Sequence, residues 1–187
     1  MKLQILVLNF RTNKEAFKLA KIIIKNDILE MMLFIWDSVS QREKIGETFI
    51  IKLANEEDMQ YLYGEDFDTE SVRKVLSAIS NREVLNKPTK KESRFWNNNM
   101  WMLEDMEFTN MMIAPVKTLN LDDVSHKLSK DEYQVIFIPG HIDEFYIAGN
   151  KLIINFFKIM IDMFGDEPPK IDGIPLKEYV EEKLMSM

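Results

Sequence analysis

The chain has 187 residues and no cysteine, and this absence removes several kinds of chemistry at once. Disulfide bonds, thiolate nucleophiles, iron–sulfur clusters and cysteine-based zinc sites are all excluded. Long hydrophobic runs are also absent, because no stretch reaches the roughly 18 apolar residues typical of a membrane-spanning helix. The apolar run in "MKLQILVLNF" is too short for a secretory signal. We therefore expect a soluble, cytoplasmic protein that does not enter a membrane.

Positive charge is in the minority. Lys and Arg number 24 against 31 Asp and Glu, which gives a formal net charge of -7 at pH 7. An acidic surface repels a phosphate backbone, so nucleic-acid binding is not expected. Hydrophobic residues make up 46% and charged residues 29%, a balance typical of a folded globular protein. The length suits one domain over residues 1–187.

Several motifs with a known chemical role are missing. The chain has no glycine-rich phosphate loop, no G-x-S-x-G elbow and no H-E-x-x-H zinc pair, and no cofactor is indicated. His126 and His141 flank a strand expected over residues 134–139, which separates them by roughly 20 Å. One zinc ion could not use both. A site of His141 and carboxylates alone would suit Mg or Mn better than Zn, but nothing fixes its ligand count, so no metal ligands are assigned.

The apolar pattern predicts strands that alternate with helices. Residues 3–9 are typical of a buried strand, and Thr12 with Glu15 then forms a capping box for a helix whose lysines keep helical spacing through Lys25. Further strands are expected over 47–53, 111–116 and 134–139. Further helices are expected over 69–80, from 151 to Gly165, and from Pro175 with Leu176, Tyr179, Val180 and Leu184 buried, with short ones after Asn55 and Asn120.

Two stretches have a second interpretation. Residues 28–37 contain "MMLFIW", which favours an inner strand, although Asp27 and Glu30 would also suit the start of a helix. Gly149-Asn150 is a typical hairpin turn between "FYIA" and "KLIINFF". Polar residues from Lys151 onward nevertheless recur at helical spacing and favour a helix there.

This alternation indicates the α/β class: a single layered domain with a mostly parallel central sheet flanked by helices. Residues 82–108 interrupt it with a basic, proline-containing stretch and three asparagines, and we expect an irregular insertion there, a lid or an interaction segment. The strand and Pro-Gly step of "DEYQVIFIPG", followed by the expected long helix, resembles class I amidotransferase-like domains. The catalytic cysteine of that family is absent, so the resemblance implies no shared reaction.

Ligands bind beyond the carboxyl ends of the strands in sheets of this kind. The loop "GHIDEF" follows the strand over 134–139 and supplies His141, Asp143 and Glu144 as candidate catalytic residues for general acid/base chemistry. The same residue types are common in surface loops. A purely structural role for them stays open.

A second loop, "NFRTN" at residues 9–13, supplies Arg11, Thr12 and Asn13 as candidate substrate-binding residues. A guanidinium and the free amides of a helix start attract an anion. An ordinary helix entry with no ligand is the alternative. The two loops together suggest an enzyme that acts on a small polar or anionic metabolite.

Trp96 and Trp101 favour a hypothesis of a different class. The Trp- and Met-rich residues 95–108 would let a non-catalytic interaction or scaffold protein dock a partner or associate into a homo-oligomer. The same side chains would equally fill a core beneath a loop. The sequence does not decide between the enzyme and the interaction protein.

Overall fold

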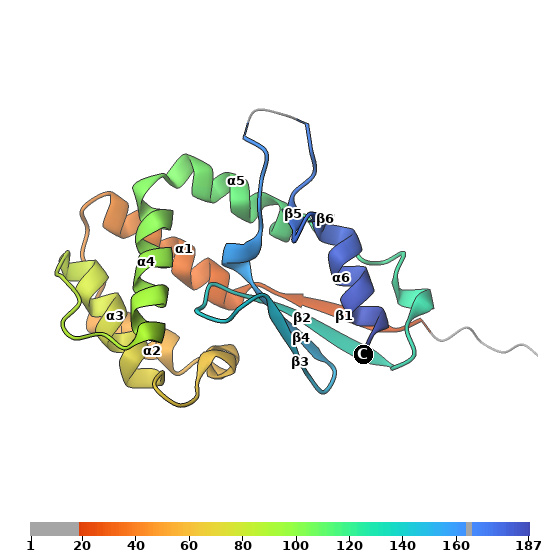
Figure 1. Cartoon of the computed structure of the whole chain (residues 1–187), viewed down its shortest axis with the longest axis horizontal. Helices are drawn as coiled ribbons and strands as arrows, with labels where there is room; N and C mark the ends of the chain where they lie inside the picture. Colours follow the sequence, from red (N-terminus) through yellow and green to blue (C-terminus); the bar gives the residue numbers. More distant parts are fainter. Residues whose placement is uncertain (1–18, 164–165) are drawn as a thin grey trace, which may run out of the picture.

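The centre of the fold is a four-stranded sheet (Figure 1). The computed structural model describes residues 19–163 and 166–187. The strands β1 (Lys21–Lys25), β2 (Glu132–Ile138) and β4 (Lys151–Asn155) are parallel neighbours, and β3 (Phe145–Ala148) pairs antiparallel with β4 at the edge, in the order β1-β2-β4-β3. The expected mostly parallel sheet with helices is confirmed.

The helices do not alternate with the strands. Five of them follow β1 in one uninterrupted series before the chain returns to β2, and Figure 1 shows them gathered to one side of the sheet. They are α1 (Asp27–Ser40), α2 (Glu47–Ala54), α3 (Thr69–Asn81), α4 (Lys90–Glu104) and α5 (Met106–Lys117). The last helix is α6 (Leu176–Met185), which follows the short hairpin of β5 (Lys170–Ile171) and β6 (Ile174–Pro175). No helix in the described ranges is both long and apolar enough to cross a lipid bilayer.

Three of the expected strands are helices. The interpretation of residues 28–37, 47–53 and 111–116 as strands was wrong, since they lie in α1, α2 and α5. Short apolar runs carry no clear period when most of their side chains are buried. In α1 the buried positions Ile28, Met32, Ile35 and Val39 keep helical spacing, and this pattern favoured the helix.

The opposite error affects two other segments. Lys21–Lys25 forms β1 rather than the end of a helix, and the segment after Gly149 is a hairpin rather than a helix. Gly149 adopts a φ of 67° at the turn, the left-handed conformation that glycine tolerates best. The chain after β4 continues as the 3-10 helix η3 (Phe156–Lys158), so the long helix on which the amidotransferase resemblance depended is absent. The strand expected over 3–9 and the capping box of Thr12 lie outside the described residues.

Residues 82–108 are more regular than expected. They contain all of α4, which begins at a capping box between Thr89 and Glu92, and the first turn of α5. The helix over 69–80, the strand over 134–139 and the final helix with its four buried residues are confirmed as α3, β2 and α6. The two short helices are 3-10 turns, η1 (Glu57–Leu62) and η2 (Ser125–Lys127).

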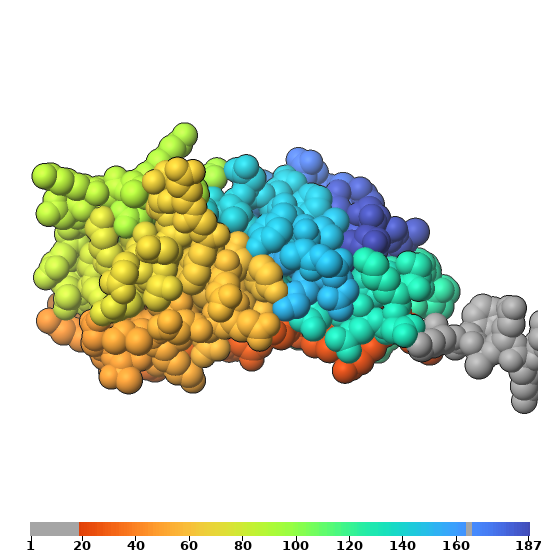
Figure 2. Space-filling view, turned by 90° about the horizontal axis from the view of Figure 1, so that it is seen from below, coloured from red at the N-terminus to blue at the C-terminus, as the bar shows by residue number. Residues whose placement is uncertain are grey.

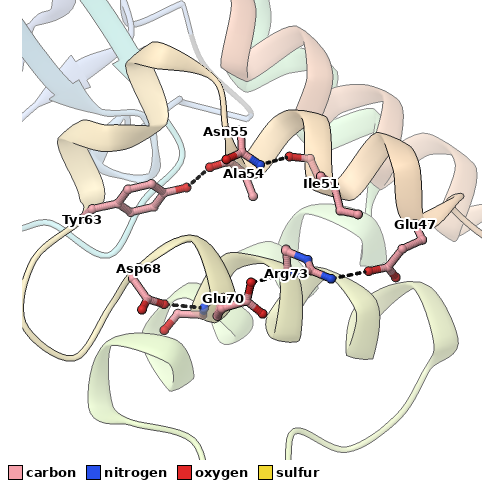
Figure 3. Close-up of polar contacts among 9 residues, drawn as sticks. Glu47, Ile51, Ala54, Asn55, Tyr63, Asp68, Glu70 and Arg73 are labelled. Atoms are coloured by element: carbon pink, nitrogen blue, oxygen red, sulfur yellow. Dashed lines mark hydrogen bonds and ion pairs between the residues drawn. The ribbon is translucent and has the colours of Figure 1, made fainter.

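Polar contacts tie the segment after η1 and the helix α3 to α2 (Figure 3). The Tyr63 hydroxyl donates to the carbonyl of Ala54 at the end of α2, and burial raises the pKa of Tyr63 to about 12, which keeps the phenol protonated as a donor. Arg73 of α3 reaches Glu47 of α2 at 2.9 Å. In the space-filling view of Figure 2, the segment around η1 lies against the β3–β4 hairpin, where Tyr146 donates to the Tyr61 carbonyl at 2.7 Å.

A buried polar contact joins α1 to α4. The indole nitrogen of Trp36 donates to Asn99 Oδ1 at 2.9 Å, and Asn99 Nδ2 donates to the Phe95 carbonyl at 2.7 Å. Trp36 and Asn99 are both fully buried, and the Trp36 ring stacks on Phe156, with centroids 6.0 Å apart. One asparagine of the "NNN" stretch is therefore part of the core.

Replacing Asn99 with Leu should lower the free energy of unfolding by about 1–3 kcal/mol, because the Trp36 indole N–H would be buried without an acceptor. Asn97→Leu is the matched control, since Asn97 is exposed on the same helix. It should change stability by no more than about 0.5 kcal/mol. Equal effects of the two variants in urea denaturation would show that the buried contact contributes nothing specific.

Candidate functional site

The loop that follows β2 packs tightly against η1. A Cβ atom on Gly140 would lie 2.3 Å from Leu62 Cδ2, so any larger residue would force the buried Leu62 side chain to shift, and this close approach favours glycine. Asn155 at the end of β4 fixes the loop from the other side, because its Nδ2 donates to the Ile142 carbonyl at 2.7 Å. The backbone around His141 is therefore set by the sheet and by η1 together.

His141 points inward. Its side chain is almost covered, with 8% of the residue exposed, and its ring meets the Phe67 ring edge-on at a centroid distance of 4.2 Å. The Nε2 atom lies 2.9 Å from the carbonyl oxygen of Leu62. A carbonyl can only accept, so Nε2 carries the proton, and in the neutral ring Nδ1 is the basic atom.

Burial lowers the pKa of His141 below its ordinary value. The hydrogen bond to Leu62 opposes this shift, whereas the positive charges of Lys91 and Arg94 add to it. Both cations belong to α4. The imidazole therefore favours the neutral form at neutral pH.

The first turns of α4 and the loop after β2 enclose a cavity of about 500 Å³, which we call the cationic pocket. It is lined by Lys90, Lys91, Ser93, Arg94, Asn97, His141 and Asp143. Arg94 Nη1 donates to the His141 carbonyl at 2.9 Å and to Asp143 Oδ1 at 3.1 Å, and the Lys91 ammonium donates to the Glu65 carbonyl. Within the described residues Lys90 makes no hydrogen bond or ion pair. Three cations thus face one carboxylate.

The start of α4 is fixed by Glu92. Its carboxylate accepts from the Thr89 amide at 2.8 Å and from the Lys74 ammonium at 2.7 Å. Burial by itself would raise the pKa of Glu92, but the contacts with Lys74 and Thr89 outweigh burial and lower it. Glu92 therefore caps the start of α4. Its charge is neutralised by Lys74 rather than by the cations of the pocket.

The structure brings together only part of the predicted site. Asp143 lies at the exposed rim of the cationic pocket, beside His141. Glu144 does not line the pocket, and its carboxylate accepts from the Tyr179 hydroxyl of α6 at 3.3 Å. Arg11, Thr12 and Asn13 lie outside the described residues.

Trp96 and Trp101 lie on different faces of α4. Trp96 is partly buried, and its indole nitrogen has no partner within the described residues. Trp101 is 70% exposed and borders an apolar groove of about 320 Å³ between α4, α5 and the residues after β4. Met102, Phe108, Met112, Phe157 and Met160 also line this groove, which we call the apolar groove.

The three cations of α4 that line the cationic pocket were not among the candidate residues predicted from the sequence. Their signal was the basic stretch "KPTKKESR", which was assigned to an insertion. This basic stretch lies beside His141 only because segments about 50 residues apart come into contact, as Arg94 does with Asp143. Across residues 19–163 and 166–187, no group of three or more His, Asp or Glu side chains is arranged to hold a metal ion.

Comparisons with protein-family models, with curated proteins and with solved structures give no match for this chain.

Replacing His141 should make stability less dependent on pH. The pKa of His141 in the folded protein lies below the unfolded value of about 6.5. The contribution of neutral His141 to the free energy of unfolding is therefore complete above pH 6.5, and it is lost as the pH falls through the folded pKa. The free energy of unfolding of the unmodified protein should decline from pH 7 to pH 5, with a smaller decline for His141→Gln. His126→Gln, at an exposed position, is the control and should retain the original slope. Identical slopes for all three proteins in denaturant titrations would contradict the assignment.

Proposed function

We propose that this protein is an enzyme that binds a small anionic metabolite in the cationic pocket. The observation that carries the proposal is the convergence of Lys90, Lys91 and Arg94 beside a buried histidine. The chain as a whole carries a net charge of -7, so an anion would be repelled by most of the surface. A local group of cations on such a protein favours a specific anion site.

The position of the cations adds to this preference. They lie in the first turns of α4, where the helix dipole and the amino-terminal amides favour negative charge. Arg94 uses Nη1 for its contacts with the loop. The rest of its planar guanidinium can bind a carboxylate or phosphate through two parallel hydrogen bonds. Asp143 is the competing anion at Arg94.

The proposed chemistry is proton transfer by His141. Its neutral ring, with Nε2 bound to Leu62, leaves Nδ1 as the basic atom, and the lowered pKa keeps that atom unprotonated at neutral pH. Asp143 is the second proton-transfer group within the same pocket. Glu144 has no part in this proposal, because it is bound to Tyr179.

Removing one cation should weaken anion binding. With inorganic phosphate and a phosphate monoester as probes at constant ionic strength, Lys90→Gln should raise the Kd roughly 5–10-fold, about 1–1.4 kcal/mol. Lys44→Gln removes the same charge at an exposed position away from the pocket and should leave the Kd unchanged. Isothermal titration calorimetry that gave equal weakening for both variants, or no binding to the unmodified protein, would contradict the proposal.

The apolar groove favours a second candidate function, an interaction protein that associates with a second copy of itself. Trp101 and Met160, at 70% and 68% exposed, are large apolar side chains beside the groove. Exposed tryptophans next to an apolar groove are typical anchors of protein interfaces. This function requires no ligand in the cationic pocket.

If Trp101 is such an anchor, Trp101→Ala should weaken self-association by more than about 2 kcal/mol. Val84→Ala is the control, because Val84 is also exposed but lies away from the groove. Sedimentation velocity over a range of concentrations measures the effect. A monomer at every concentration for the unmodified protein would rule out self-association.

A further inference from the structure

A smaller cavity of about 220 Å³ adjoins the cationic pocket along α4. We call it the side cavity, and it is lined by Val84, Leu85, Pro88, Ser93, Trp96 and Asn97. Ser93 and Asn97 also line the cationic pocket, and they lie about one turn apart on the helix. The two cavities therefore meet along these two residues, and one small molecule can occupy both.

The far side of the side cavity is apolar. Val84 and Pro88 belong to the segment between α3 and α4, and Trp96 comes from α4 itself. Val84 is 91% exposed, and Trp96 is partly exposed beside it. An apolar group placed between them would remove this surface from water, and each Å² of apolar surface so covered contributes about 25 cal/mol. This part of the cavity therefore favours an apolar group.

The two residues at the boundary are polar, but they differ in what they can offer a ligand. The Ser93 hydroxyl donates to the Thr89 carbonyl at 2.9 Å, so its proton is already used. The Asn97 side chain is exposed and makes no hydrogen bond within the described residues. Its amide is a free donor and acceptor at the point where the two cavities meet. A polar atom that joins an anionic group to an apolar group would lie there.

The charge of the cationic pocket favours a dianion over a monoanion. Three positive charges come from Lys90, Lys91 and Arg94. The carboxylate of Asp143 offsets one of them, which leaves two. Glu92 offsets none, because it is paired outside the pocket. A phosphate monoester carries a charge of about -1.5 to -2 at pH 7 and matches this surplus, whereas a carboxylate neutralises only half of it.

We propose that the ligand of the cationic pocket is a phosphate monoester of a small apolar ring, with the phosphate beside the α4 cations and the ring in the side cavity. This inference rests on the proposed function, because it names the class of anion that the pocket binds. A cavity of about 150 Å³ is sufficient to hold benzene. The side cavity, at about 220 Å³, is large enough for one six-membered ring beside Trp96.

Isothermal titration calorimetry with methyl phosphate and phenyl phosphate tests the proposal, at constant ionic strength and above the second phosphate pKa of about 6. Phenyl phosphate should bind roughly fivefold more tightly, because only its ring reaches the side cavity. Val84→Ser should reduce this ratio of Kd values to about twofold and leave the Kd of methyl phosphate unchanged. Val84 is 91% exposed, so the variant should fold normally.

Ile147→Thr is the control, since Ile147 is also exposed but lines neither cavity, and it should leave the ratio unchanged. Lys90→Gln should weaken both esters by the same factor. Equal Kd values for the two esters, or a ratio that Val84→Ser does not lower or that Ile147→Thr lowers equally, would overturn this inference and leave the anion site intact. If neither ester binds, the proposed function fails as well.

Discussion

The parallel pairing of β1 with β2 is the constraint on which the rest of the structure depends. Lys21–Lys25 hydrogen-bonds to a strand that begins only at Glu132, so everything between them must leave at the carboxyl end of the sheet and return to its amino end. A parallel pair cannot be joined by a tight turn. In this chain the connection contains α1 to α5, and it carries η1 and the start of α4 to the edge where β2 ends.

The proposed anion site follows from that arrangement. Beyond β2, Gly140 allows the loop to approach Leu62, and the His141 hydrogen bond ties the sheet to η1 while α4 supplies cations alongside. Beyond β1, the buried Lys25–Asp58 pair joins the sheet to the same 3-10 helix. The η1 turn thus contacts the ends of two parallel strands. Carboxyl ends of parallel strands are the usual place for ligands in α/β proteins.

The sequence predicted some elements well and others not at all. The amphipathic spacing of α3 and α6 was sufficient to predict a helix, because their apolar residues lie on one clear face. The short apolar run of β2 was likewise sufficient to predict a buried strand. The apolar runs in α1, α2 and α5 are helices that pack against neighbouring helices, and a short apolar run taken alone does not separate a buried helix from a buried strand. The segment that forms β4 was predicted to be a helix instead of part of a hairpin, because Asn155 and the other polar residues after Lys151 keep helical spacing. Pairing with β2 makes that segment a strand.

By itself the sequence determined the class of fold, the lack of thiol chemistry, and a histidine just beyond the strand that is now β2. Only the tertiary structure decided what surrounds that histidine. Its pKa depends on burial beside Phe67 and on charges from α4, and these neighbours lie dozens of residues away in the chain. Asp58 Oδ1 likewise lacks a hydrogen-bond partner among the described residues only because folding removes it from water. Burial and electrostatic interaction act through space, so they could not be derived from the order of residues alone.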